Sequence, residues 1–176
     1  DFILGGEECE LVDDVEIEGI ATTPRIVIAN SNDGVSIDAG QSDYFVFGDN
    51  GQITASTSDL TRFSIGTITL GLVETIESLI GGSDTINTDG GKDIILGGIA
   101  GDEITAGDGD NIVLGDSGSI DYDLDGNPGD IDLIVSTEPD DGGADTIVTG
   151  QDADIILGGE DGDNIDGGAG FNVVFG

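Results

Sequence analysis

The stretch that decides the fold is Asp84–Asn111, with the sequence DTINTDGGKDIILGGIAGDEITAGDGDN. In it an Asp or Asn recurs every nine residues, and a branched aliphatic residue follows each of them two positions later. The same pattern returns in a second block further along the chain. The acidic or amide positions are Asp84, Asp93, Asp102, Asn111, Asp145, Asp154, Asp163 and Asn172. The aliphatic positions are Ile86, Ile95, Ile104, Val113, Ile147, Ile156, Ile165 and Val174. A fixed period of this kind indicates a repeat architecture.

Within each unit, three residues such as Thr85–Asn87 are long enough for one short strand. The six residues that remain are rich in Gly and form a turn, because Gly adopts positive φ without a steric penalty. Two strands and two turns close one coil of 18 residues, and coils stack at the strand spacing of about 4.8 Å. We therefore predict an all-β fold, a parallel β-roll or β-helix solenoid with glycine-rich turns, whose thin aliphatic core is completed by neighbouring coils.

The charge balance sets a second constraint. Of the 176 residues, 38 are Asp or Glu and three are Lys or Arg, so the formal net charge is −35. Self-repulsion of that size opposes a compact state. The hydrophobic residues nevertheless make up 36% of the chain and recur periodically, unlike those of a disordered chain. We infer that counter-cations belong to the fold, and we exclude nucleic acid and insertion into a membrane as partners.

Several functional classes are excluded by missing residue types. The chain has no His, Met or Trp, and Cys9 is its single cysteine. A disulfide framework, a Cys/His zinc site and a Ser-His-Asp or Cys-His catalytic site are therefore excluded within one chain. We expect no enzymatic activity and no catalytic residues. Cys9 is either a free thiol or pairs between chains. The chain opens at Asp1 without an initiator Met, so we expect it to be a segment of a longer protein.

A longer period lies above the nine-residue one. Phe45-Val-Phe-Gly-Asp-Asn-Gly51 resembles Ile112-Val-Leu-Gly-Asp-Ser-Gly118, and Val173–Gly176 begins a third copy of this Gly-Asp-x-Gly terminator. We therefore divide a single elongated solenoid (1–176) into three modules. The first (1–51) is partial and carries an acidic insertion at about 7–24; the second (52–118) has its repeats at 81–118; the third (119–176) has its repeats at 140–176. Metal-free coils are expected to separate the two metal-binding blocks.

The less regular segments carry their own predictions. Asp1–Gly6 (DFILGG) matches Asp93–Gly98 and Asp154–Gly159 (both DIILGG), so the chain begins inside a repeat. Ile26, Val35 and Tyr44 occupy the acidic position of units before the first block, which should be coils of the same solenoid without a carboxylate. Residues 65–70 and 73–80 alternate as strands do, although the second of them could form a short helix instead.

Calcium is the ion that the repeats suit. It takes six to eight oxygen ligands at about 2.3–2.6 Å and mixes carboxylates with backbone carbonyls, whereas magnesium requires a tighter octahedron. Residues 18 apart should face each other across stacked turns. These pairs are Asp84 with Asp102, Asp93 with Asn111, Asp145 with Asp163, and Asp154 with Asn172. Asn supplies a carbonyl oxygen but no charge, so we expect weaker sites at the Asn111 and Asn172 ends of the blocks.

These repeats resemble the RTX (repeats-in-toxin) family, whose nonapeptide is G-G-x-G-x-D-x-U-x with a large aliphatic residue at U. The closest matches are GGIAGDEIT (97–105), GGEDGDNID (158–166) and GGAGFNVVF (167–175). The resemblance implies a parallel β-roll that holds several calcium ions between its turns, and export by a type I secretion system. This sequence departs from the motif at Ala100, Asp152 and Asp161, which replace its second-half Gly, and at Asn111 and Asn172.

A separate acidic segment, Asp121–Asp132, has the sequence DYDLDGNPGDID. Asp121, Asp123, Asp125 and Asp132 fall at positions 1, 3, 5 and 12, and Gly follows at position 6, as in a calcium loop of EF-hand type. Flanking helices are not indicated, Pro128 occupies position 8, and position 12 is Asp where the EF-hand has Glu. The segment is therefore either an additional calcium site or an acidic turn.

Together these features predict a secreted or cell-surface calcium-binding module with a structural or adhesive role, which folds and stacks when calcium binds. Two alternatives stay open. The chain could be a subunit of a filament or surface layer that self-associates head to tail, or the secretion and folding segment of a larger secreted enzyme.

Overall fold

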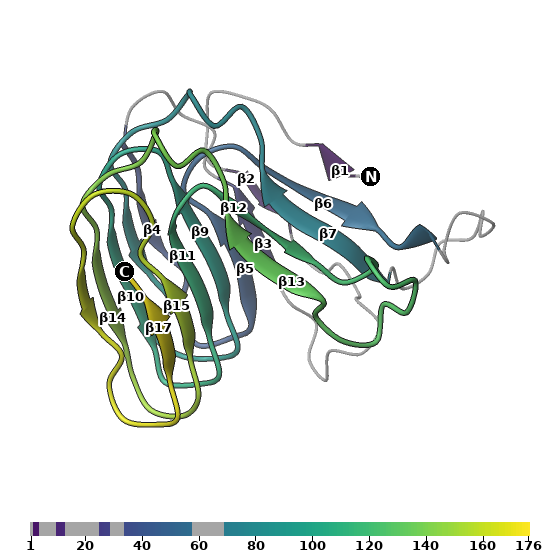
Figure 1. Cartoon of the computed structure of the whole chain (residues 1–176). Coiled ribbons are helices and arrows are strands. Elements are labelled where there is room, and N and C mark those ends of the chain that lie inside the picture. The colour runs from purple at the N-terminus through teal and green to yellow at the C-terminus, as the bar shows by residue number, and fades with distance from the viewer. Residues whose placement is uncertain (1, 4–9, 13–24, 29–33, 58–68) are drawn as a thin grey trace.

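The computed structural model describes residues 2–3, 10–12, 25–28, 34–57 and 69–176, and these residues form three β-sheets (Figure 1). Two of the sheets are built from parallel strands that the chain visits alternately, so the fold is an all-β parallel solenoid of the β-roll kind. The third sheet is antiparallel. In the described part of the chain, no helix has the length and apolarity needed to cross a membrane.

The first parallel sheet, called the middle sheet here, has seven strands. Their order is β17 (Val173–Phe175), β15 (Ile155–Leu157), β11 (Ile112–Asp116), β9 (Ile94–Gly98), β5 (Tyr44–Phe47), β3 (Arg25–Ile28) and β2 (Glu10–Val12). All neighbouring strands are parallel except β2 and β3, which are antiparallel. Of the acidic insertion expected at about 7–24, the described part is the strand β2; its other residues lie outside the described ranges.

The second parallel sheet, called the outer sheet, has five strands. Their order is β16 (Asn164–Asp166), β14 (Thr146–Thr149), β10 (Glu103–Gly107), β8 (Thr85–Asn87) and β4 (Ser36–Asp38). Strands β4 and β5 extend the two parallel sheets in the register predicted from Val35 and Tyr44. Strand β3 also extends the middle sheet, but the register predicted from Ile26 is wrong by one residue. Arg25 pairs with Tyr44 and Val27 with Val46, so Arg25 and not Ile26 stands at the acidic position.

The antiparallel sheet is formed by segments that lie outside the two repeat blocks. Its order is β1 (Phe2–Ile3), β6 (Gly51–Ala55), β7 (Leu70–Thr75), β12 (Gly118–Asp121) and β13 (Leu133–Ser136). Strands β6–β7 and β12–β13 are two hairpins that lie side by side along the roll (Figure 1). Part of the segment 73–80 is therefore strand, in β7, and none of it is helical. The strand expected at 65–70 lies outside the described residues except for Thr69 and Leu70, and of these two Leu70 begins β7.

The three sheets form layers with two apolar cores between them. The core inside the roll contains the predicted aliphatic positions Ile86, Ile95, Ile104, Val113, Ile147 and Ile156, with Ile165 packed against it. The second core lies between the middle sheet and the antiparallel sheet, and it includes Phe45, Phe47, Leu96, Leu114 and Ile120. Because the middle sheet is covered on both faces, its strands β5 and β9 are buried along their whole length.

The two repeat blocks stack directly on each other. Ile104 on β10 pairs with Ile147 on β14, and Val113 on β11 pairs with Ile156 on β15. The expectation that metal-free coils separate the blocks is therefore wrong, because the intervening residues leave the roll to form the β12–β13 hairpin. Asn111 consequently lies inside the stack and not at an end of it.

The turns adopt the conformations that the motif requires, including at its substituted positions. Ala100, Asp152 and Asp161, which replace Gly in the repeat, have φ values of 71°, 86° and 65°. A residue with a Cβ atom pays about 1 kcal/mol or more for this left-handed conformation. The three positions are therefore strained.

Replacing Ala100 with Gly should relieve this strain and raise the free energy of unfolding by up to about 1 kcal/mol, after the greater entropy of Gly in the unfolded chain is allowed for. Denaturant unfolding measures the change. Ala106→Gly is the matched control: Ala106 is fully buried on β10, so this substitution should destabilise the protein. An Ala100→Gly variant that loses as much stability as Ala106→Gly would contradict the assignment.

Candidate cation-binding ladders

The eight acidic or amide positions of the repeats form two columns along the roll. Each residue lies directly before a strand, so stacking of the strands brings the columns together. The first column, called ladder one, precedes the outer-sheet strands and contains Asp84, Asp102, Asp145 and Asp163. The second, called ladder two, precedes the middle-sheet strands and contains Asp93, Asn111, Asp154 and Asn172. The pairs predicted to face each other are adjacent in these columns.

Neighbouring members of ladder one are joined by hydrogen bonds from backbone to side chain. The Oδ1 atom of each Asp accepts the backbone N–H of the equivalent residue in the preceding coil. The Asp84 N–H donates to Asp102 Oδ1 and the Asp102 N–H donates to Asp145 Oδ1, both at 2.8 Å. The Asp145 N–H donates to Asp163 Oδ1 at 3.0 Å. At the start of the column, Val35 donates its N–H to Asp84 Oδ1 at 2.8 Å, although it has no carboxylate of its own.

Ladder two repeats this arrangement with two amides in it. The Tyr44 N–H donates to Asp93 Oδ1 at 2.8 Å, and the Asp93 N–H donates to Asn111 Oδ1 at 3.1 Å. The Asn111 N–H donates to Asp154 Oδ1, and the Asp154 N–H donates to Asn172 Oδ1, both at 3.0 Å. Asn therefore makes the same backbone contact as Asp. In Asn111 the Nδ2 group also donates hydrogen bonds to the carbonyl oxygens of Gly107 and Gly109.

The second carboxylate oxygen of each Asp is left without a hydrogen-bond partner. The Oδ2 atoms of all six ladder aspartates are buried and unpaired: Asp84, Asp93, Asp102, Asp145, Asp154 and Asp163. A buried polar atom without a partner costs about 1–3 kcal/mol, and a charged one costs more. Six such atoms in register are therefore a large unfavourable contribution unless a cation or a proton reaches them.

In ladder one the unpaired oxygens point at glycine backbone. A Cβ atom added to Gly115 would lie 1.9 Å from Asp145 Oδ2 and 2.5 Å from the carbonyl oxygen of Gly158. A Cβ atom on Gly97 would similarly meet Asp102 Oδ2 at 2.3 Å and the Gly115 carbonyl oxygen at 2.0 Å. These positions must be Gly, and they bring carboxylate and carbonyl oxygens to the same place, as a calcium site requires.

Burial raises the pKa of these carboxyl groups in the cation-free fold. It raises the pKa of Asp102 to about 9, with smaller contributions from the neighbouring charges of Asp84 and Asp145. The pKa values of Asp84 and Asp145 are each raised to about 7, again chiefly by burial. Burial also raises the pKa of Asp93 to about 6. A cation beside the Oδ2 atoms would favour the charged carboxylates.

The acids are arranged in columns and do not gather into clusters. Among the described residues, no three acidic side chains converge closely enough to hold one metal ion. A bound cation would therefore be held by one or two ladder carboxylates, with backbone carbonyls completing its ligands. Calcium accepts such a mixed oxygen set, which keeps the ladder residues suitable for it.

The acidic loop Asp121–Asp132 is the turn region of the β12–β13 hairpin, and its carboxylates mostly serve the local backbone. Asp121 Oδ1 accepts the Asp123 N–H at 2.9 Å, and Asp132 Oδ2 accepts the Asp125 N–H at 3.0 Å. Asp123 Oδ2 accepts both the N–H and the hydroxyl of Thr57. The four predicted residues, Asp121, Asp123, Asp125 and Asp132, therefore lie on one loop, but the Asp123 carboxylate binds Thr57, which follows β6.

Two further buried acids belong to the site and were not predicted. Asp49 Oδ1 accepts the Gly82 N–H at 3.2 Å, and its Oδ2 accepts the Ile99 N–H at 2.7 Å. Asp116 makes the corresponding bonds to the Gly143 and Glu160 N–H groups. Burial raises the pKa of each of these two carboxyls to about 6.

Asp49 and Asp116 are the aspartates of the Gly-Asp-x-Gly terminator. Each stands where the chain leaves the roll and accepts a hydrogen bond from a residue near the point where the chain returns to it. Asp49 binds Gly82, and Asp116 binds Gly143. The repetition of the terminator was the signal in the sequence that could have identified them.

Comparison of this chain with known protein families, with curated proteins and with solved structures found no match.

The raised pKa values predict how the metal-free protein responds to pH. The unfolded chain titrates near the ordinary Asp value of about 3.8, whereas the folded Asp84, Asp102 and Asp145 hold their protons up to about pH 7–9. In that window the folded state binds more protons, so its stability should be greatest near pH 4 and fall as the pH rises to 9. The β-sheet circular dichroism signal of the metal-free protein, followed from pH 4 to 9, tests this, and a signal that grows from pH 5 to 8 would contradict it.

Asp102→Asn separates this effect from general charge repulsion. The variant keeps the Oδ1 acceptor, as Asn111 does, but removes the titrating group. Metal-free Asp102→Asn protein should therefore lose less stability than the wild type between pH 6 and 9. Asp140→Asn, at an exposed position, removes the same formal charge and should leave the pH dependence close to that of the wild type.

Proposed function

We propose that this chain is an extracellular calcium-binding structural module of the RTX kind, which folds and stacks its coils when calcium binds. The observation that carries the proposal is the row of buried, unpaired Oδ2 atoms, which in ladder one lie beside glycine carbonyl oxygens. Oxygen ligands of both types suit calcium, and the chain has no His and a single Cys to favour a softer metal.

Calcium would couple to folding through charge. Without it, a net charge of −35 and the buried carboxylates oppose closure of the coils. With it, each ion neutralises carboxylates that only the stacked coils bring together, so binding energy becomes folding energy. Millimolar calcium outside the cell and much lower calcium inside would then restrict folding to the exported protein. Type I secretion is the route that the RTX resemblance implies.

We assign no catalytic role to the chain. The ions would lie along the two ladders, and Asp154 and Asp163 would bind them as the other four ladder aspartates do, because all six stand directly before a strand. The loop Asp121–Asp132 is a further, separate candidate, because Asp123 Oδ1 is also buried and unpaired. The carboxylates of Asp121 and Asp132 would have to turn away from their backbone partners to join it.

Circular dichroism with a chelator tests the main proposal. Exhaustive chelation at pH 8 should abolish the β-sheet signal, and calcium should restore it cooperatively, because the coils depend on their neighbours. Magnesium at the same concentration should restore less of it. An unchanged spectrum after complete calcium removal would refute calcium-dependent folding.

Substitution in ladder one locates the ions. Asp145→Asn keeps the Oδ1 contact but removes a buried charge beside the Gly158 carbonyl, so it should raise the calcium midpoint of folding several-fold. Asp140→Asn is the matched exposed control and should leave the midpoint unchanged. Equal midpoints for both variants and the wild type would place the ions outside the ladders.

A further inference from the structure

Asp49 and Asp116, called the terminator acids here, occupy equivalent places in the fold, and neither belongs to a ladder. Each stands where the chain leaves the middle sheet for one of the two hairpins. Their side chains are almost completely buried, with relative exposures of 4% and 3%. Burial of a charged carboxyl is unfavourable unless the group is paired or hydrogen-bonded. A buried acid at both exits therefore needs a physical reason.

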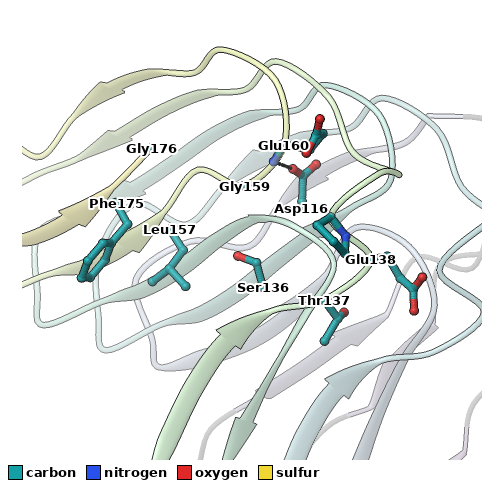
Figure 2. A pocket seen from close by; sticks show the side chains of 10 residues that line it. Asp116, Ser136, Thr137, Glu138, Leu157, Gly159, Glu160, Phe175 and Gly176 are labelled. Carbon is teal, nitrogen blue, oxygen red and sulfur yellow. Dashed lines mark hydrogen bonds between the residues drawn. The ribbon is translucent and has the colours of Figure 1, made fainter.

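Each terminator acid joins three segments of the chain. One of its oxygens accepts the N–H of a glycine near the point where the hairpin returns, Gly82 or Gly143. The other accepts the N–H of a residue in the turn of the next coil, Ile99 or Glu160. Figure 2 shows the bond between Asp116 and Glu160. Because both oxygens are occupied, the terminator acids fasten the chain and offer no free oxygen to an ion.

A pair of glycines in that turn lies between each terminator acid and a carboxylate of ladder one. A Cβ atom added to Gly97 would lie 2.3 Å from Asp102 Oδ2. A Cβ atom added to Gly98 would lie 2.2 Å from Asp49 Oδ2. The turn after β15 repeats this arrangement at 2.0 and 2.1 Å, and its residues are Gly158 with Asp163, and Gly159 with Asp116. Each glycine pair therefore has an unpaired carboxylate oxygen on one residue and a hydrogen-bonded one on the other.

The terminator acids add negative charge where ladder one already has unpaired oxygens. Burial is the main cause of the raised pKa values of Asp84 and Asp102, and the charge of Asp49 raises both further. Burial is also the main cause for Asp145, and the charge of Asp116 adds to it. Each hairpin exit thus has its own acidic neighbours in ladder one. They are Asp84 and Asp102 for Asp49, and Asp145 and Asp163 for Asp116.

The terminator acids act on a bound cation through their charge and not as ligands. Among the described residues, no three acidic side chains stand close enough together to ligate one ion. A terminator charge nevertheless attracts a cation at the neighbouring Oδ2 atoms, because Coulomb attraction acts beyond ligand distances and is stronger in a buried site than in water. That cation in turn offsets the repulsion between the terminator acid and the ladder. The two effects are equal in free energy by linkage.

We propose that Asp49 and Asp116 couple closure of the two hairpins to cation binding in ladder one. Asp49 fastens the β6–β7 hairpin to the turn that contains Ile99, and Asp116 fastens the β12–β13 hairpin to the turn that contains Glu160. A cation at the adjacent ladder-one acids favours the charged terminator carboxylate, and so it favours the closed hairpin. The antiparallel sheet is then a second calcium-dependent layer, in which each hairpin responds to its own part of ladder one.

This inference rests on the proposed function, calcium binding in ladder one, and hydrogen exchange of the full chain tests both separately. In saturating calcium, Asp116→Asn should exchange faster than the wild type in β12–β13 and at an unchanged rate in β6–β7. The ratio of the two β12–β13 rates should grow several-fold as calcium is lowered toward the folding midpoint, because the variant holds the adjacent cation less tightly. Asp140→Asn, an exposed substitution in the same returning segment, should leave both hairpins unchanged.

The calcium dependence of that ratio separates coupling from a merely structural role. A structural role gives the same ratio at every calcium concentration, and a constant ratio would overturn the inference while leaving calcium binding intact. Wild-type strands β8, β10 and β14 whose exchange does not respond to calcium would instead contradict the proposed function.

Double substitution tests which ladder acids each terminator acid serves, and it needs only the calcium midpoint of folding. Asp116→Asn should raise that midpoint about five-fold in the wild type, as expected for charges in one network. The increase should be the same in an Asp84→Asn background and clearly smaller in an Asp145→Asn background. Asp49→Asn should show the reverse dependence on these two backgrounds. Equal increases in every background would overturn the local pairing of hairpins with ladder-one acids.

Discussion

The structure depends on one repeated contact, in which the Oδ1 atom of an Asp or Asn accepts the backbone N–H of the equivalent residue in the preceding coil. Eight such bonds of 2.8–3.1 Å tie the coils together at both sheets. Each of these bonds is made by the residue directly before a strand, so together they hold the coils in the register of the two parallel sheets. It also brings a second, unpaired oxygen of each Asp into the interior, which only a cation or a proton could satisfy there.

This coupling explains a composition that is otherwise difficult to reconcile with a folded chain. The acids are not confined to a solvated surface, since Asp93 and Asp154 are almost completely buried. Glycine is as necessary as the acids, because Gly97 and Gly115 leave the space that a carboxylate and a carbonyl oxygen share. The aliphatic core between the coils stabilises the stack, but this core is thin. The cost of burying the ladder carboxylates is therefore large enough to affect whether the coils stack.

The sequence was sufficient to predict the roll, since the nine-residue period fixes which side chains face inward and which turns stack. Ile86, Ile104 and Ile147 follow that prediction. It was not sufficient to predict the third layer. A signal for it was present, because middle-sheet strands begin with three apolar residues, as in Ile94–Leu96, whereas outer-sheet strands place polar residues on both sides of the inward aliphatic one, as in Thr85–Asn87. Single-period analysis treats both types of unit alike and so misses the second core.

The joining of the two blocks could not be deduced from spacing alone. A 43-residue separation between Asp102 and Asp145 suggests intervening coils, but the structure places the two residues in hydrogen-bond contact. The segment between them leaves the roll and forms the β12–β13 hairpin. Asp116 accepts the N–H groups of Gly143 and Glu160, and these bonds hold the two ends of the hairpin together so that the coils on either side can stack. Such a contact depends on a turn geometry that composition and periodicity do not specify.

A crystal structure determined in millimolar calcium would test the central claim most directly. The account predicts ions along ladder one, each within about 2.3–2.6 Å of an Asp Oδ2 atom and of a glycine carbonyl oxygen, beginning with Asp102 and Asp145. The Oδ1 to N–H bonds should remain as they are. A folded roll whose Oδ2 atoms contact only protein or water, with no ion in either ladder, would contradict it.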